Sequence, residues 1–105
     1  MLVKFDDRWR RLQTWRFPSS VLERLAPKSS SGGVWDGRGL LYVTGHDAAE
    51  LYVLRLPRRG DVLEHVATIA APIAGQAIAL DPKDPRLIYG IRRADRQVVA
   101  MRLPR

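Results

Sequence analysis

Short apolar runs separated by turn-forming residues dominate the chain and predict β-strands. Residues 40–43 (LLYV) and 51–54 (LYVL) are apolar at every position, which is typical of strands covered on both faces. Residues 62–69 alternate apolar and polar side chains, as a more exposed strand does. With a short strand at residues 33–36 and turns rich in Gly, Pro and Asp, residues 33–69 predict a four-stranded antiparallel meander of strands a, b, c and d.

The pattern of this meander recurs along the chain. Residues 40–58 align without gaps on residues 87–105, at an offset of 47 residues. The identical aligned pairs are Leu40/Leu87, Tyr42/Tyr89, Arg55/Arg102, Leu56/Leu103, Pro57/Pro104 and Arg58/Arg105. A weaker copy, residues 2–18, aligns with residues 41–57 at an offset of 39. The segment VLERL that follows it, at residues 21–25, resembles the start of strand d.

A four-stranded unit of about 40 to 50 residues, repeated in tandem, predicts the blades of a β-propeller. We therefore expect one all-β repeat domain over residues 1–105, with blade units at about 1–32, 33–76 and 77–105. Along the chain the strands would run bcd, abcd and abc, which makes ten strands and about two and a half blades. The alternative is an ordinary antiparallel sandwich of hairpins, which requires no self-similarity at this offset.

Two segments of the central unit resemble known propeller blades. Residues 35–44 (WDGRGLLYVT) and 50–54 (ELYVL) are similar to blades of the NHL-like and lactonase-like six-bladed propellers, and of glutaminyl-cyclotransferase-like propellers. The resemblance covers most of residues 33–69 and, less closely, residues 77–104. It implies the geometry of a blade. The acidic metal ligands of the lactonase group have no counterpart in this sequence, so no metal site and no particular cofactor is predicted.

The predicted number of strands is too small to close the ring of a propeller. Closed propellers need at least four blades, and closure removes exposed strand edges. A chain with two and a half blades would leave edges open at Leu2-Val3 and at residues 98–103. We therefore expect a homo-oligomer, most simply a dimer that closes a six-bladed ring, or a trimer. The alternative is that the chain is part of a longer propeller.

The resemblance also implies where a ligand would bind. In such propellers, ligands sit at the central channel on the face formed by the b–c and d–a loops, and strand a lines that channel. The residues that these positions select are Trp35, His46, Asp47, Gln76, Arg92 and Arg93. Together they predict a site for a small polar ligand or a protein.

Within this set, His46 and Asp47 are the pair with catalytic character, because an imidazole beside a carboxylate can transfer protons. Neighbouring residues in a hairpin loop rarely point the same way, however, and Asp commonly forms turns. A binding module is therefore the favoured function. The alternative is an enzyme of the lactonase-like or cyclotransferase-like type, with its site at the central channel.

Other recurring residues are expected to hold the blades together. Asp36 and Asp81 recur after strand a and are expected to form turns. Trp15 is expected in the core, and His65 on an exposed outer strand. An arginine recurs two residues before the proline that ends strand c, and its recurrence favours a structural bridge: Arg16, Arg55 and Arg102.

Composition narrows the classes of function. The chain has 105 residues, 18 Lys and Arg against 11 Asp and Glu, and a net charge of +7. The basic residues are spread along the sequence without a nucleic-acid-binding motif, which favours a solvated rim over a surface that binds polyanions or nucleic acid. The absence of cysteine excludes disulfides, thiol catalysis and Cys-ligated metals.

Targeting signals are not visible in the sequence. No apolar run approaches the ~20 residues of a membrane span, so no membrane partner is expected. The N-terminus lacks the apolar core of a secretory signal peptide, so a cytoplasmic location is the default expectation.

Overall fold

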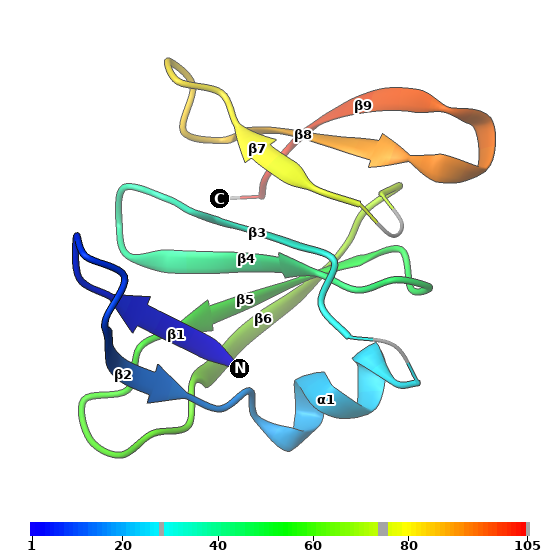
Figure 1. Ribbon diagram of the computed structural model, residues 1–105. Helices are drawn as coiled ribbons and strands as arrows, with labels where there is room; N and C mark the ends of the chain where they lie inside the picture. The colour runs from blue at the N-terminus through cyan, green and yellow to red at the C-terminus, as the bar shows by residue number, and fades with distance from the viewer. Residues whose placement is uncertain (28, 74–75, 105) are drawn as a thin grey trace.

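The computed structural model describes residues 1–27, 29–73 and 76–104 as three antiparallel sheets and one helix (Figure 1). The first sheet contains β1 (Leu2–Phe5) and β2 (Arg11–Trp15). The second contains β3 (Gly32–Trp35), β4 (Leu40–Thr44), β5 (Glu50–Arg55) and β6 (Glu64–Ala70). The third contains β7 (Ile78–Leu80), β8 (Leu87–Arg92) and β9 (Gln97–Arg102), with a single 3-10 turn, Arg93–Asp95, between the last two. The helix α1 (Ser19–Leu25) follows β2. The all-β class is thus confirmed for the described chain.

The middle sheet is the predicted meander. Its strands are hydrogen-bonded in the order β3-β4-β5-β6, and the apolar run at residues 40–43 lies in β4. Every residue of β4 after Leu40 is buried, and so are the four central residues of β5. The fully apolar runs therefore lie in strands that are covered on both faces, as predicted.

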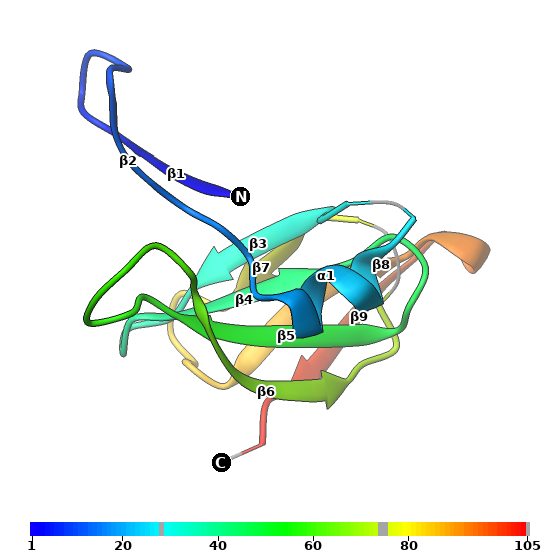
Figure 2. The same cartoon turned by 90° about the horizontal axis from the view of Figure 1, so that it is seen from below.

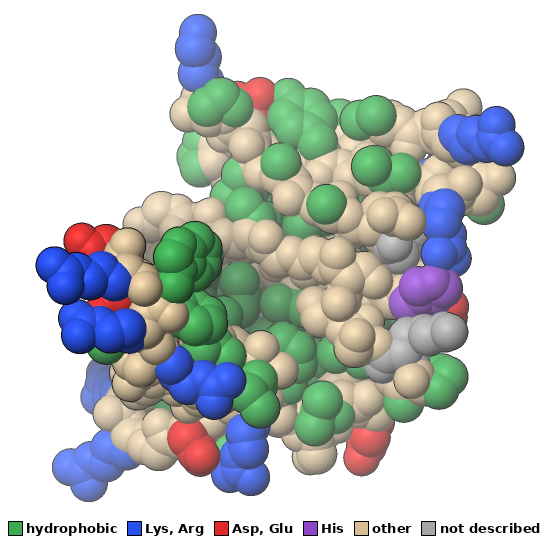
Figure 3. All heavy atoms as spheres, in the orientation of Figure 1, with side chains coloured by type: hydrophobic (Ala, Val, Ile, Leu, Met, Phe, Trp, Pro, Cys, Tyr) green, Lys and Arg blue, Asp and Glu red, His purple; other side chains and the backbone are tan. Residues whose placement is uncertain are grey.

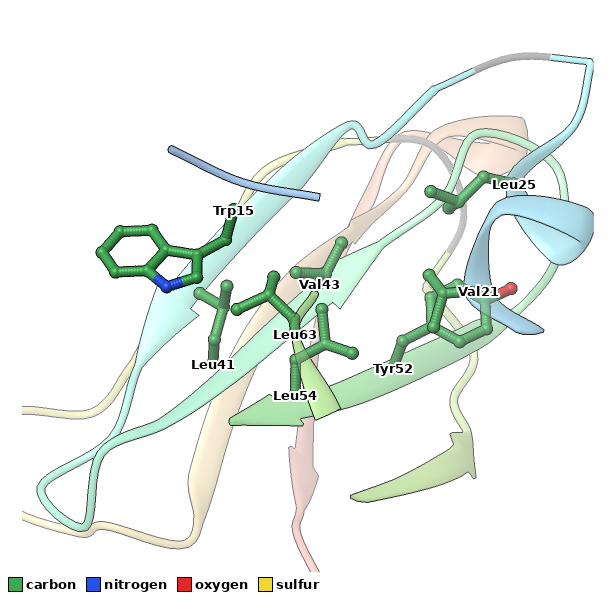
Figure 4. Packing of buried hydrophobic residues seen from close by; sticks show 8 residues of the cluster. All are labelled: Trp15, Val21, Leu25, Leu41, Val43, Tyr52, Leu54 and Leu63. Atoms are coloured by element: carbon green, nitrogen blue, oxygen red, sulfur yellow. The ribbon is translucent and has the colours of Figure 1, made fainter. Parts of the chain in front are cut away.

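Two hydrophobic clusters flank this sheet. On one face, Leu41, Val43, Tyr52 and Leu54 pack against residues from β2, α1 and the position just before β6, namely Trp15, Val21, Leu25 and Leu63 (Figure 4). On the other face, Tyr42, Leu51 and Val53 pack against Ala71, Ile73, Ile78, Ile88 and Leu103. The period of two along each strand separates these sets. Trp15 lies in the core, as expected.

Residues 21–25 form part of a helix, so the strand expected there is a wrong prediction. Val21 and Leu25 are four residues apart and both are buried, while Leu22 points outward and is exposed. This spacing places the two buried side chains on one helical face. Pro18 precedes the helix and serves as its N-cap residue, where its missing N–H has no consequence. The described residues therefore form nine strands rather than ten.

The first hairpin has the turn of the β3–β4 hairpin. In each, an aspartate (Asp6 or Asp36) accepts hydrogen bonds through Oδ1 from the backbone N–H groups two and four residues later. In each, the residue three positions after the aspartate, Trp9 or Gly39, has a positive φ. By this turn, β1 and β2 correspond to strands a and b. The alignment with residues 41–57, which made them strands b and c, is corrected by the turn geometry.

The third sheet lies beside the second, with β7 next to β3 (Figure 1). It has the order β7-β8-β9 and, within the described residues, no fourth strand. The aligned pair Arg58/Arg105 includes a residue outside the described part. The β1–β2 hairpin projects away from the other two sheets (Figure 2). The middle sheet is thus the one whose two faces are both covered.

Candidate functional site

The predicted b–c loops of the second and third sheets meet at one edge of the molecule. His46 lies in the loop between β4 and β5, and Arg93 begins the turn between β8 and β9. These two residues occupy equivalent positions, because the offset of the repeat carries residue 46 onto residue 93. We call the residues His46, Asp47, Arg92 and Arg93 the loop edge. Figure 3 shows a histidine and basic side chains together where these loops lie.

A chain of hydrogen bonds joins Arg93, His46 and Asp47. The Nη1 atom of Arg93 lies 2.7 Å from Nε2 of His46, and Nδ1 of His46 lies 2.6 Å from Oδ1 of Asp47. A guanidinium can only donate, so Nε2 must accept and the proton of the imidazole must sit on Nδ1. His46 therefore donates to Asp47, and the two neighbouring side chains point toward each other. The geometry assigns one tautomer to His46.

Arg92 and Arg93 differ in their partners. The Nε atom of Arg92 donates to both carboxylate oxygens of Asp95, at 3.0 and 2.9 Å, and its Nη2 atom donates to Gln97. The hydrogen bond to Asp95 raises the pKa of Arg92 above its ordinary value. Among the described residues, Arg93 forms no ion pair with a carboxylate. Arg92 therefore stabilises its own turn, while Arg93 contacts a neutral ring nitrogen of the neighbouring loop.

Gln76 lies at the same end of the sheets as the loop edge. The hydroxyl of Thr44, which is fully buried, donates to the backbone carbonyl of Gln76 at 3.1 Å. Gly32 lies opposite Thr44 in the β3–β4 pair. A Cβ atom on Gly32 would lie only 2.9 Å from this carbonyl oxygen, so a glycine is needed for the approach. These contacts of Thr44 and Gly32 with Gln76 hold the start of β7 against the start of β3.

Trp35 does not converge with the other predicted residues. It pairs with Leu41 at the beginning of β4, whereas His46 follows the end of β4. The strands of an antiparallel hairpin place these positions at opposite ends of the sheet. There Trp35 lines a separate cavity of about 520 Å³ with residues from the β7–β8 turn, including Asp81 and Pro82. The part of the prediction that put Trp35 beside His46 is therefore wrong.

The residues assigned to structural roles make polar contacts with neighbouring segments. The recurring arginines form ion pairs with acidic residues of neighbouring segments: Arg16 with Asp61 at 3.1 Å, Arg55 with Glu64 at 2.7 Å and Arg102 with Asp84 at 2.7 Å. His65 lies on the outer strand β6, as predicted, but it is half-buried. Its Nδ1 atom is 2.8 Å from the hydroxyl of Ser20 in α1. Because the helix was not predicted, this contact could not be.

The sequence also left two features of the site unassigned. Two contacts join the second sheet to the third: that of Arg93 with His46, and the hydrogen bond from Thr44 to Gln76. The repeat offset was the one signal for the first contact, since it placed both residues at the same point of equivalent loops. No signal in the sequence indicated that Thr44 would be buried.

The comparisons with known proteins add nothing to this geometry. No family model, no curated protein and no solved structure matches the chain. In the described part of the chain, no group of three or more His, Cys, Asp or Glu residues is placed to hold a metal ion. Nor does that part contain a helix of the length and apolar character needed to cross a membrane.

Proposed function

We propose that this chain supplies β-propeller blades and binds a small polar ligand with an anionic group at the loop edge. The observation that carries the proposal is the contact of Arg93 with His46, which joins equivalent loops of two neighbouring sheets. A guanidinium whose partner is a neutral nitrogen, rather than a carboxylate, retains its positive charge for a ligand. A site between equivalent loops is where the resemblance to propeller families predicts ligands.

Three features of the fold support the propeller part of the proposal. The middle sheet is a four-stranded meander covered on both faces. The third sheet repeats its first three strands, and the two strands a, β3 and β7, lie next to each other. Adjacent first strands in neighbouring sheets are what blades around a central axis would have. Completion of the ring would require further blades, and we propose that other copies of the chain supply them.

The chemistry of the loop edge favours binding over catalysis. An anionic group that accepts from Arg93 would compete with Nε2 of His46 for the guanidinium, and Nε2 would then face the ligand. Asp47 would continue to hold the imidazole through Nδ1. A carboxylate or phosphate would gain two N–H donors from the planar guanidinium. None of these groups is a nucleophile activated by a base.

Titration with inorganic phosphate tests this site. Isothermal titration calorimetry of the wild-type chain should show saturable binding, because a bidentate contact to a guanidinium is a strong hydrogen bond. The Arg93→Ala variant should bind phosphate at least about tenfold more weakly, because each lost hydrogen bond to a charged group contributes about 1.5–3 kcal/mol. The matched control is Arg59→Ala, which removes the same charge from an exposed turn. Equal losses in both variants would show a general effect of charge and would contradict the proposal.

A catalytic function is the second candidate, and one observation favours it. The 2.6 Å contact of His46 Nδ1 with Asp47 orients the imidazole, as a carboxylate does for a general base. If the chain is a lactonase-like or cyclotransferase-like enzyme, a panel of lactones or N-terminal glutaminyl peptides should be turned over. Both His46→Ala and Asp47→Ala should abolish that turnover without changing the thermal unfolding midpoint. Unchanged turnover in either variant would remove this candidate.

A further inference from the structure

The third sheet carries an apolar face that no described residue covers. Val98 is 75% exposed, and its register partner Ile91 is also exposed. On the same face, Tyr89 pairs with Ala79 on one side and with Ala100 on the other. We call these five residues, Ala79, Tyr89, Ile91, Val98 and Ala100, the outer patch. Hydrophobic side chains are visible on the surface over this sheet (Figure 3).

The repeat shows what such a face does elsewhere in the chain. At the offset of 47 residues, Tyr89, Val98 and Ala100 correspond to Tyr42, Leu51 and Val53. Those three residues form the face of the middle sheet that packs against the third sheet, through Ile78, Ile88 and Leu103. The outer patch is therefore equivalent to a face that binds the next sheet along the stack.

The β1–β2 hairpin, at the other end of the stack of sheets, also exposes apolar side chains. Trp9 is 81% exposed, and Met1, Phe5 and Leu12 are also exposed. The rings of Phe5 and Trp9 contact each other, with centroids 5.8 Å apart, and the hairpin projects from the body (Figure 2). Trp15 anchors the hairpin in the core. Because a two-stranded hairpin is marginally stable by itself in water, a surface that covers its exposed side chains would stabilise it further.

We propose that the outer patch of one copy of this chain binds the β1–β2 hairpin of a second copy. The inference deepens the proposed assembly of blades and rests on it, since it names the two surfaces that join. The middle sheet turns one face toward the first sheet and the other toward the third. A head-to-tail contact preserves this direction of stacking, whereas a contact between two outer patches would reverse it. The occupant is a second copy because the hairpin and the outer patch both expose apolar side chains, and each surface could cover the other.

Variants on each surface test this contact, with molar mass measured by light scattering on a sizing column at several concentrations. Val98→Asp places a charge in the outer patch, and the double variant Trp9→Asp/Leu12→Asp places two on the hairpin. The positive φ of Trp9 is tolerated by Asp. Each variant alone should be monomeric while the wild type is oligomeric. An equimolar mixture should form a one-to-one complex, because one intact patch and one intact hairpin remain.

The controls separate this inference from the rest of the proposed function. Val66→Asp changes an exposed valine on the outer strand β6 and should leave the mass unchanged, and near-ultraviolet circular dichroism verifies that all variants fold. A Val98→Asp chain that keeps the wild-type mass would overturn the outer patch as the interface. If Val98→Asp is monomeric but the hairpin variant and the mixture behave as wild type does, the hairpin is not the partner. A wild type that is monomeric throughout overturns self-assembly, while phosphate binding at the loop edge stays measurable.

Discussion

At the scale of single residues, aspartates fix the turns of this fold. Asp36 has a side chain that is 3% exposed, and its Oδ1 atom accepts from the backbone N–H groups of Arg38 and Leu40 at 2.8 and 2.9 Å. Its Oδ2 atom accepts from the hydroxyl of Tyr42 at 3.1 Å. Asp81 has the same relation to Tyr89, at 2.6 Å. The aspartate and the tyrosine thus recur together, and each pair ties a turn to the following strand b.

These turns predict an acid-sensitive fold. Burial alone would raise the pKa of Asp36, but the hydrogen bonds from Leu40, Arg38 and Tyr42 outweigh it and hold that pKa below its ordinary value of 3.8. The pKa of Asp81 is lowered by the hydroxyl of Tyr89 and by backbone N–H groups. A carboxyl whose pKa is lower in the folded state adds stability that is present above pH 3.8 and lost as the pH falls through the folded-state pKa.

We expect Asp36→Asn to show this contribution. At neutral pH the variant should be less stable by about 1–2 kcal/mol, because its hydrogen bonds no longer involve a charged acceptor. Its stability should also fall less steeply than that of the wild type as the pH drops below 3.8. Urea unfolding at a series of pH values measures both effects. Asp7→Asn, at an exposed position of the first hairpin, is the control. A parallel pH profile in the wild type and Asp36→Asn would contradict the assignment.

At the scale of elements, a small residue in one strand packs against a large residue from a neighbouring segment. Gly90 of β8 aligns with Val43 of β4 in the repeat. The space that a side chain at residue 90 would occupy is filled by Ile73, from the segment before β7. A Cβ atom on Gly90 would lie 2.5 Å from Cδ1 of Ile73, which is fully buried. Since a buried isoleucine has little room to shift, the small residue of β8 and the large residue of the preceding segment depend on each other.

Gly90→Ala should therefore be destabilising by overpacking, by about 1–3 kcal/mol. Adding Ile73→Val should recover part of that loss, because the two sites share one space and are not additive. Gly37→Ala is the control, since nothing lies within 4 Å of its added Cβ atom. Thermal and urea unfolding of Gly90→Ala, Ile73→Val, the double variant and Gly37→Ala measure the differences. If the losses of Gly90→Ala and Ile73→Val simply add in the double variant, the packing argument fails.

The sequence pattern predicted the elements whose periodicity is local. The strand at residues 40–44 and the order of the meander followed from apolar runs and turns. The segment at residues 21–25 was misassigned because five residues with apolar positions at 21, 22 and 25 fit either a strand or one helical face. The contact of His46 with Arg93 depends on how two sheets pack, which no local pattern specifies. The position of Trp35 was misjudged because the last residue of strand a lies at the a–b turn, away from the b–c loop.

At the scale of the whole molecule, the described sheets differ in how far their apolar side chains are covered. The middle sheet packs against a neighbour on each side. The outer patch and the hairpin keep exposed Val98 and Trp9. Each copy also carries a net charge of +7, so copies repel each other while their apolar surfaces attract. The balance of these two terms determines the degree of assembly.

Salt should shift this balance toward assembly. Between about 0.1 and 1 M NaCl the screening length falls from about 10 to about 3 Å, which weakens repulsion between like-charged copies and leaves burial of the outer patch intact. We therefore expect the dissociation constant from sedimentation equilibrium to fall as NaCl rises. A surface that bound polyanions would respond in the opposite way, because counterion release weakens such binding at high salt. Chains that dissociate as NaCl rises would show that ion pairs, rather than the apolar surfaces around Val98 and Trp9, hold the copies together.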